Sequence, residues 1–155
     1  MQDEIFMREA LDEAQIAYNL GEVPVGAVVV FQNQIIARAH NQVETLQDAT
    51  AHAETLCLRL AAQSLANWRL LGCTLYSTLE PCLMCAGSLI LSRVQTVVWG
   101  APDPRHGAGG SLMNVFINHP IHQVEVRQGI LREQSADLLK KFFQERRKCK
   151  ISLTS

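Results

Sequence analysis

Residues 72–100, with the sequence GCTLYSTLEPCLMCAGSLILSRVQTVVWG, decide the fold class of this chain. The stretch opens with an apolar and β-branched run at 73–78, which is typical of a buried strand. Pro81 then suits the first turn of a helix. We predict that this helix runs through Leu91 and that a second strand follows at 96–99. Since a helix joining two strands of one sheet makes a right-handed crossover, the stretch predicts parallel strands.

The sequence on either side continues the alternation of helices and strands. Strands at 26–31 and 35–39 are separated by a short turn, which predicts an antiparallel hairpin. We therefore predict an α/β fold of three layers: a mixed five-stranded sheet, largely parallel apart from the opening hairpin, with helices on both faces. The other expected elements are a helix from a cap at Asp3 toward Leu20, a helix at 51–62, a strand at 124–127 and a helix at 135–148.

Length and composition favour one compact domain that spans residues 1–155. The chain is 48% hydrophobic and has no internal repeat or long linker. No apolar run approaches the roughly 20 residues that would span a bilayer, and the first residues lack the basic stretch of a secretory signal. We expect a cytoplasmic protein with no membrane partner. The odd cysteine count, five, argues against a disulfide framework and for reduced thiols.

Charge is distributed unevenly along the chain. Net charge is −1, yet residues 140–150 hold six basic residues and one acidic residue. We expect these to lie on a basic C-terminal helix at about 135–150, which could contact nucleic-acid phosphates. A solvated helix end whose dipole is complemented by cations remains an equal alternative.

Two short motifs carry the chemistry: His52-Ala53-Glu54, and Pro81-Cys82-Leu83-Met84-Cys85. Catalytic zinc takes three protein ligands and keeps a fourth position for water. His52, Cys82 and Cys85 supply three such ligands. In the first turn of a helix the dipole favours the thiolate of Cys82, and Cys85 falls on the same face three residues later.

Glu54 lies two residues after His52, beside the expected metal but free of it. Its carboxylate could take a proton from zinc-bound water and pass it to a substrate, which describes a hydrolase. The alternatives are a structural zinc site or a redox pair. A structural site usually needs a fourth ligand, and the spare thiols do not supply one: Cys57 and Cys73 are expected in the core and Cys149 in the basic tail.

The paired motifs resemble the signature of the cytidine/deoxycytidylate deaminase superfamily. Over nearly its whole length the chain is similar to the bacterial tRNA-specific adenosine deaminases. The matching segments are EVPVGAVV at 22–29, Asn41, TAHAE at 50–54, TLEPCLMCAG at 78–87 and GAGGSL at 107–112.

The resemblance implies a cytidine-deaminase-like fold with one Zn²⁺ per subunit. It also implies hydrolysis of adenosine to inosine at the wobble position (34) of the anticodon of an arginine tRNA. In that reaction a zinc-activated hydroxide attacks C6 of the flipped base, with Glu54 as proton shuttle.

Further site residues follow from the same resemblance. Asn41 would hydrogen-bond the purine edge, Val25 would line the base pocket, and the backbone N–H of Ala53 would add a contact. Asp103 matches a position that contacts the RNA sugar, which could distinguish RNA from DNA through the 2′-OH. Without the resemblance, Asn41 could end a strand and Asp103 could hold a turn.

Contacts to the tRNA anticodon stem-loop are expected from the loop after the fourth strand and from the basic helix. Arg105-His106 departs from the bacterial enzymes, and His106 is not needed as a ligand. The Phe142-Phe143 pair could instead be one core and one peripheral residue. The candidate RNA contacts are Arg105, Phe142, Phe143, Arg146 and Arg147.

The helix at 83–91 is apolar or small on nearly every side, which favours a homodimer interface. The resemblance also implies a dimer with active sites near that interface. Two rival functions remain. One is a deaminase of the same fold that acts on a free base or nucleoside, namely cytosine, cytidine or guanine. The other is a non-catalytic RNA-binding module with structural zinc, in which Glu54 would have no role.

Overall fold

The computed structural model describes residues 1–154, which form five helices and five strands. The expected elements lie within three residues of their predicted starts and ends, apart from the C-terminal end of the last helix. The elements are α1 (Gln2–Asn19), β1 (Gly26–Phe31), β2 (Gln34–His40), α2 (Val43–Leu46), α3 (Ala53–Leu65), β3 (Thr74–Leu79), α4 (Leu83–Leu91), β4 (Thr96–Ala101), β5 (Glu125–Gln128) and α5 (Arg132–Leu153).

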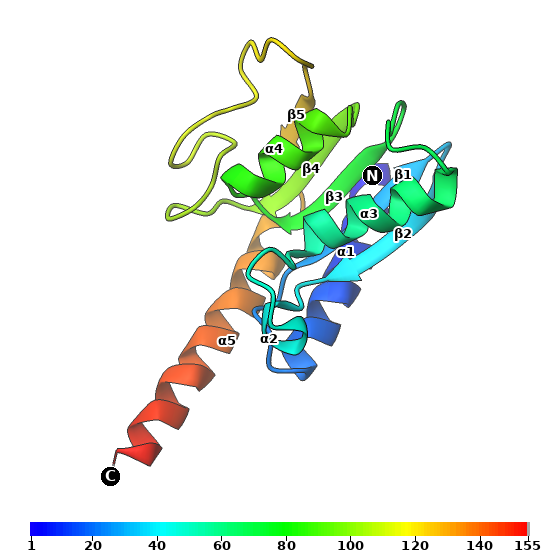
Figure 1. Ribbon diagram of the computed structural model, residues 1–155. Coiled ribbons are helices and arrows are strands. Elements are labelled where there is room, and N and C mark those ends of the chain that lie inside the picture. Colours follow the sequence, from blue (N-terminus) through cyan, green and yellow to red (C-terminus); the bar gives the residue numbers. More distant parts are fainter. Residues whose placement is uncertain (155) are drawn as a thin grey trace.

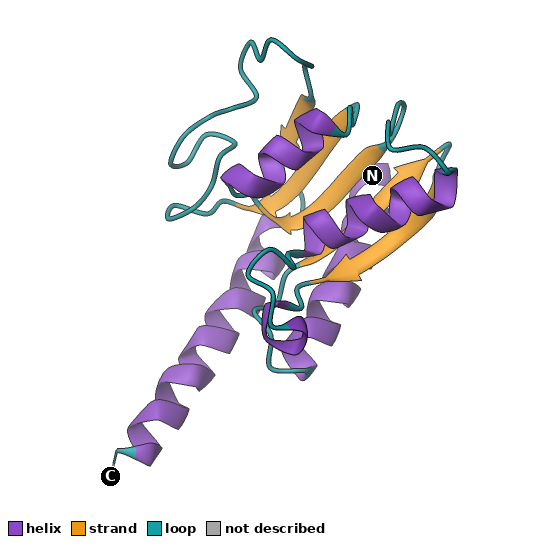
Figure 2. Cartoon of the chain, viewed as in Figure 1, coloured by secondary structure: helices purple, strands orange, loops and turns teal. Residues whose placement is uncertain are grey.

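The strands form one mixed sheet in the order β2-β1-β3-β4-β5 (Figure 2). The opening hairpin of β1 and β2 is antiparallel, as predicted, and β3, β4 and β5 are parallel neighbours. The expectation that the rest of the sheet is parallel is wrong at one pairing, because β1 and β3 are antiparallel. The chain segment containing α3 does join parallel strands, β2 and β3, but β1 lies between them in the sheet.

Helices cover both faces of the sheet, which gives the predicted three layers. In Figure 1, α3 and α4 lie in front of the sheet and α1 and α5 lie behind it. β1 and β4 are buried along almost their whole length, as expected of strands covered on both faces. Successive side chains therefore enter different cores: Val29 packs toward α3, and Val28 and Val30 pack toward Met7 of α1.

Local corrections concern the helix ends. Asp3 does not cap α1, which begins at Gln2; its carboxylate instead accepts a hydrogen bond from Tyr76 Oη at 2.8 Å and pairs with Arg127 at 3.1 Å. Pro81 does not open α4, because Cys82 is the extended N-cap residue before it. The short helix α2 was not predicted. α5 is longer than expected at both ends, and its far end projects away from the sheet (Figure 1).

All five cysteines are free thiols, as the composition predicts. Cys57 and Cys73 are buried in the core, and Cys149 is exposed on α5, also as predicted. Within residues 1–154, no helix is both long enough and apolar enough to span a bilayer.

Candidate active site

The N-termini of α3 and α4 meet beside the end of β3, and they bring the two sequence motifs together. His52 is the N-cap residue of α3, and Cys82 is the N-cap residue of α4. Cys85 lies in the first turn of α4 and is fully buried. The first N–H groups of a helix have no partners within it, so both helices direct positive dipole ends toward this point. Such an environment favours thiolates.

The three predicted ligand atoms lie at metal-binding separations. His52 Nδ1 is 3.5 Å from Cys82 Sγ and 3.4 Å from Cys85 Sγ. A tetrahedral zinc ion with ordinary bond lengths would hold nitrogen and sulfur about 3.6 Å apart. All three ligand atoms lie within 4.8 Å of one another, and no fourth His, Cys, Asp or Glu of residues 1–154 joins the group. The donor set fits zinc with one coordination position left for water or substrate.

The two thiols shift each other's pKa in opposite directions. A hydrogen bond from Cys85, helped by His52, lowers the pKa of Cys82 to about 4, so that its thiolate predominates at neutral pH. The same hydrogen bond raises the pKa of Cys85, because that thiol then carries the shared proton. A hydrogen bond to Cys82 also raises the pKa of His52. The proton that Cys85 holds is one that a divalent cation would displace.

Glu54 adds a carboxylate beside this cluster without being one of the three ligands. It lies in the first turn of α3 and is only 4% exposed. Burial raises its pKa, although His52 opposes part of this effect. A raised pKa lies closer to neutral pH, and a carboxyl group with such a pKa is better suited to accept and then release a proton.

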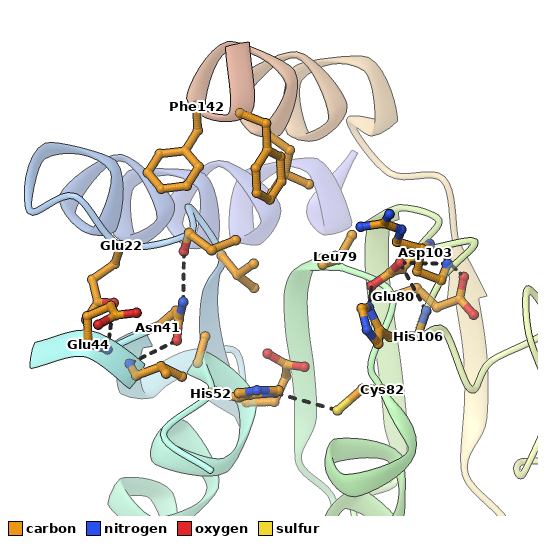
Figure 3. A pocket seen from close by; sticks show the side chains of 18 of the residues that line it. Glu22, Asn41, Glu44, His52, Leu79, Glu80, Cys82, Asp103, His106 and Phe142 are labelled. Atoms are coloured by element: carbon orange, nitrogen blue, oxygen red, sulfur yellow. Dashed lines mark hydrogen bonds and ion pairs between the residues drawn. The ribbon is translucent and has the colours of Figure 1, made fainter. Parts of the chain in front are cut away.

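The cluster opens into a cavity of about 860 Å³, which is lined by residues of α2, α3 and α5, by the end of β3 and by the adjoining loops. Figure 3 shows His52 and Cys82 at its base and Phe142 of α5 across from them. The cavity brings together all the predicted site residues except two, the buried ligand Cys85 and the outward-facing Arg147. Those that line it are Val25, Asn41, His52, Ala53, Glu54, Cys82, Asp103, Arg105, Phe142, Phe143 and Arg146.

Asn41 has a structural role as well as a place in the cavity. Its amide nitrogen donates to the carbonyl oxygen of Val23 at 3.2 Å, and its amide oxygen accepts from Val43 N at 3.2 Å. It follows β2 directly, so the strand-ending role that the sequence left open is present. One N–H and one oxygen lone pair of the amide stay available to a ligand. Val25 and Ala53 lie in the same wall.

Asp103 also combines two features. Its Oδ1 accepts hydrogen bonds from the backbone N–H groups of Arg105 and His106, at 3.1 and 3.2 Å, which is the turn-holding arrangement. Its Oδ2 lies 3.6 Å from His106 Nδ1. His106 is outside the metal-binding group, as predicted, and it extends with Arg105 from the loop that forms one rim of the cavity.

α5 closes the side of the cavity opposite the metal ligands. Phe142 is buried and packs edge-on against Tyr18 of α1, whereas Phe143 is 46% exposed; the pair is therefore one core and one peripheral residue. Arg146 donates to the carbonyl oxygen of Gly21 and lies over the Phe142 ring. These contacts fix the basic helix against α1 and beside the cavity.

Sequence reasoning missed two carboxylates at the cavity rim, Glu22 and Glu80, which are 1% and 3% exposed. Each accepts backbone hydrogen bonds from a segment distant in sequence, Glu22 from α2 and Glu80 from the loop after β4. Both lie inside segments on which the family resemblance rests. A burial pattern alone does not distinguish such residues from surface acids, because their donors come from elsewhere in the chain.

Comparison with known proteins agrees with this geometry. A family model described as MafB19-like deaminase matches residues 1–147. The tRNA-specific adenosine deaminase of Bacillus subtilis (strain 168) is 53% identical over 150 residues, which cover 96% of this chain and 93% of that protein. The tRNA-specific adenosine deaminase of Aquifex aeolicus (strain VF5) is 44% identical and covers 95% of this chain and 97% of its own length.

Solved structures give the same result. One from a study of A-to-I editing by tRNA:A34 deaminases at the wobble position has a TM-score of 0.81 at 41% identity and covers 86% of this chain and 98% of its own. The guanine deaminase from Nitrosomonas europaea has a TM-score of 0.77 at 27% identity, over 90% and 83% of the two chains. This chain therefore belongs to the tRNA-specific adenosine deaminase family, within the cytidine/deoxycytidylate deaminase superfamily.

Proposed function

We propose that this protein hydrolyses adenosine to inosine at wobble position 34 of a tRNA anticodon, with an arginine tRNA as substrate. One observation carries the proposal: a buried carboxylate, Glu54, stands beside a three-ligand metal cluster at the base of a cavity large enough for a flipped base. Relatives at up to 53% identity over nearly the whole chain support adenosine in tRNA as the target.

The chemistry divides between the cluster and Glu54. Zinc held by His52, Cys82 and Cys85 would activate a water molecule for attack on C6 of adenine. Glu54 would move two protons: it would take one from the attacking water and pass it to N1 of the base, then take one from the new C6 hydroxyl and pass it to the departing amino group, which leaves as ammonia. Its burial suits this role, since burial raises the pKa of the carboxyl and so favours its taking up the proton that it later delivers.

The cavity walls supply the recognition groups. Asn41 and Val25 both line the cavity, and the amide of Asn41 keeps one N–H that could bind a purine edge. The backbone N–H of Ala53, at the start of α3, has no partner within the helix and can donate to the base. Asp103 on the opposite rim would meet the ribose, and a 2′-OH there would distinguish RNA from DNA.

The direct test is incubation of the zinc-loaded protein with an arginine tRNA that carries adenosine at position 34, followed by nucleoside analysis. We expect inosine. The guanine deaminase neighbour makes deamination of a free base the specific rival. Conversion of free guanine or cytidine, with the tRNA adenosine left intact, would overturn the proposed substrate. The cytoplasmic location expected from the sequence stays a prediction.

RNA affinity is expected to depend on the exposed basic side of α5. Arg147 is a better probe than Arg146, because within residues 1–154 its side chain bonds only to its own helix, from Nε to Phe143 O at 3.4 Å. Reversing its charge removes attraction to phosphate and adds repulsion. Arg147→Glu should raise KM for the anticodon stem-loop about fivefold at low salt, and the difference should shrink as salt is added.

The matched control is Arg132→Glu, an exposed arginine at the start of the same helix, about 22 Å from Arg147 along its axis. It should change KM little. Equal effects of the two reversals would show that net charge, not the end of α5, determines RNA binding.

A homodimer through α4 is the second part of the proposal. Leu83 and Leu91 of α4 are 54% and 58% exposed, so the helix presents apolar side chains that a partner subunit could cover. Leu91→Asp should convert a dimer into a monomer in sedimentation equilibrium. Ile5→Asp, which alters an apolar residue that is 56% exposed on α1 across the sheet, is the control and should leave the dimer intact. A wild-type protein that sediments as a monomer would contradict this assignment.

A further inference from the structure

Glu22 and Glu80 are buried carboxylates for which the proposed reaction has no use. They lie on opposite rims of the cavity in Figure 3, Glu22 near Asn41 and Glu80 near Asp103, with His52 and Cys82 between them. A carboxylate is costly to bury unless hydrogen bonds replace its lost water. Their donors therefore indicate what each one does.

Glu80 is surrounded by donors from one loop. Its Oε1 accepts from Asp103 N at 3.1 Å and from the Ser111 hydroxyl, and its Oε2 accepts from Gly109 N at 3.0 Å and Ser111 N at 3.2 Å. These four donors span residues 103–111. One carboxylate thus binds both ends of the loop that presents Asp103 and Arg105 to the cavity.

The loop is closely fitted around this carboxylate. A Cβ on Gly107 would lie 2.2 Å from Glu80 Oε2, so only glycine allows the backbone to pass there. Ala108 N also donates to Pro81 O at 2.9 Å. Since Pro81 precedes Cys82, the loop lies directly against the segment that carries this proposed metal ligand.

Glu22 plays the same part on the other rim. Its Oε1 and Oε2 accept from Glu44 N and Thr45 N, both at 2.9 Å. Burial alone would raise its pKa, but these backbone donors outweigh burial and lower it, so the carboxylate is charged at neutral pH. The segment it holds, residues 41–45, begins with Asn41.

We propose that Glu80 and Glu22 are positioning residues for substrate recognition, with Glu80 ordering the 103–111 loop that presents Asp103 and Glu22 ordering the 41–45 segment that presents Asn41. Neither is a catalytic residue. The loop donors occupy both oxygens of Glu80, and Glu22 is committed to two backbone N–H groups. The expected change in KM rests on the proposed RNA substrate, whereas the ordering of the 103–111 loop and of the 41–45 segment does not.

The first experiment therefore uses no substrate. Amide hydrogen exchange is measured on zinc-loaded wild type, Glu80→Gln and Glu22→Gln. Each glutamine keeps one acceptor oxygen but turns an NH₂ toward backbone donors. Glu80→Gln should speed exchange at Asp103, Gly109 and Ser111 about tenfold or more and leave residues 44 and 45 unchanged. Glu22→Gln should give the reverse pattern, so each variant is the control for the other.

The second experiment measures coupling in deamination of the anticodon stem-loop. Glu80→Gln alone should raise KM about tenfold with kcat and zinc content nearly unchanged. In an Asp103→Asn background, the same substitution should raise KM only about twofold, because the group it positions has been altered. In an Asn41→Ala background it should keep its full effect. Glu22→Gln should couple to Asn41 and not to Asp103.

The outcomes separate the two proposals. If wild type forms no inosine, the proposed function fails, and the crossed exchange pattern still decides the positioning roles. If wild type is active but exchange spreads over the whole chain, or the KM effects are additive in both backgrounds, the positioning roles are overturned. Should Glu80→Gln fail to fold, Gly107→Ala displaces the same carboxylate from the loop side. Failure of both to fold would make Glu80 a requirement of the fold, which also contradicts the proposal.

Discussion

Replacement of Glu54 by glutamine is expected to lower kcat for adenosine deamination by about 10² to 10⁴-fold, the usual contribution of a positioned acid or base. Glutamine has nearly the same shape, so the cavity should keep its form. It cannot accept and release a proton, however, and the reaction needs both. Because Glu54 is not one of the three ligands, the variant should retain one zinc ion per chain and bind the stem-loop as tightly as wild type.

Glu13→Gln is the matched control. Glu13 is also a mostly buried carboxylate beside a histidine, His40 at 3.1 Å, but it lies outside the cavity. Its loss should leave kcat unchanged. Zinc content, RNA affinity and kcat are measured on all three proteins. A Glu54→Gln enzyme with more than about a tenth of wild-type kcat would exclude the proton-transfer role. A wild type that binds zinc and RNA without deaminating would support the non-catalytic alternative.

The proposed metal-binding cluster was predictable from sequence because each of its two motifs is short and chemically distinctive, and the structure does bring His52, Cys82 and Cys85 together. His52 and Glu54 are two residues apart, Cys82 and Cys85 are three apart, and few proteins need that combination for anything but a metal. The strands were predictable for a similar reason: β1 and β4 are continuous apolar runs. Neither inference required knowledge of which segments meet in space.

What the sequence could not give depends on long-range pairing. Strand pairing is one case, since β1 comes between β2 and β3 although α3 links those two. The roles of Glu22 and Glu80 are another, because their hydrogen-bond donors lie more than 20 residues away in sequence. The local sequence shows that these side chains are polar, but only the fold shows which distant backbone segments they bind.

Removal of one metal ligand is the second change expected to have a very large effect. Cys85→Ala leaves His52 and Cys82 as the only protein ligands, and two ligands do not hold catalytic zinc. Mutation of a residue that only hydrogen-bonds a metal ligand lowers metal affinity by about 10–100-fold. Because Cys85→Ala removes a ligand itself, we expect zinc affinity to fall by more than about 100-fold. Inosine formation should fall below detection at ordinary zinc concentrations.

Cys57→Ala distinguishes loss of a ligand from loss of a buried cysteine. Cys57 is fully buried on α3, one turn after Ala53, but its thiol points to the carbonyl oxygen of Ala27 and not to the cluster. This variant should be less stable, since truncating a core side chain leaves a small void, yet it should keep one zinc ion and full kcat. Chelation of wild type should reproduce the Cys85→Ala defect and re-addition of Zn²⁺ should reverse it. A Cys85→Ala protein that keeps stoichiometric zinc would mean that the metal is bound elsewhere. Loss of zinc from both Cys85→Ala and Cys57→Ala would mean that the defect arises from misfolding of α3 and α4, not from loss of a ligand.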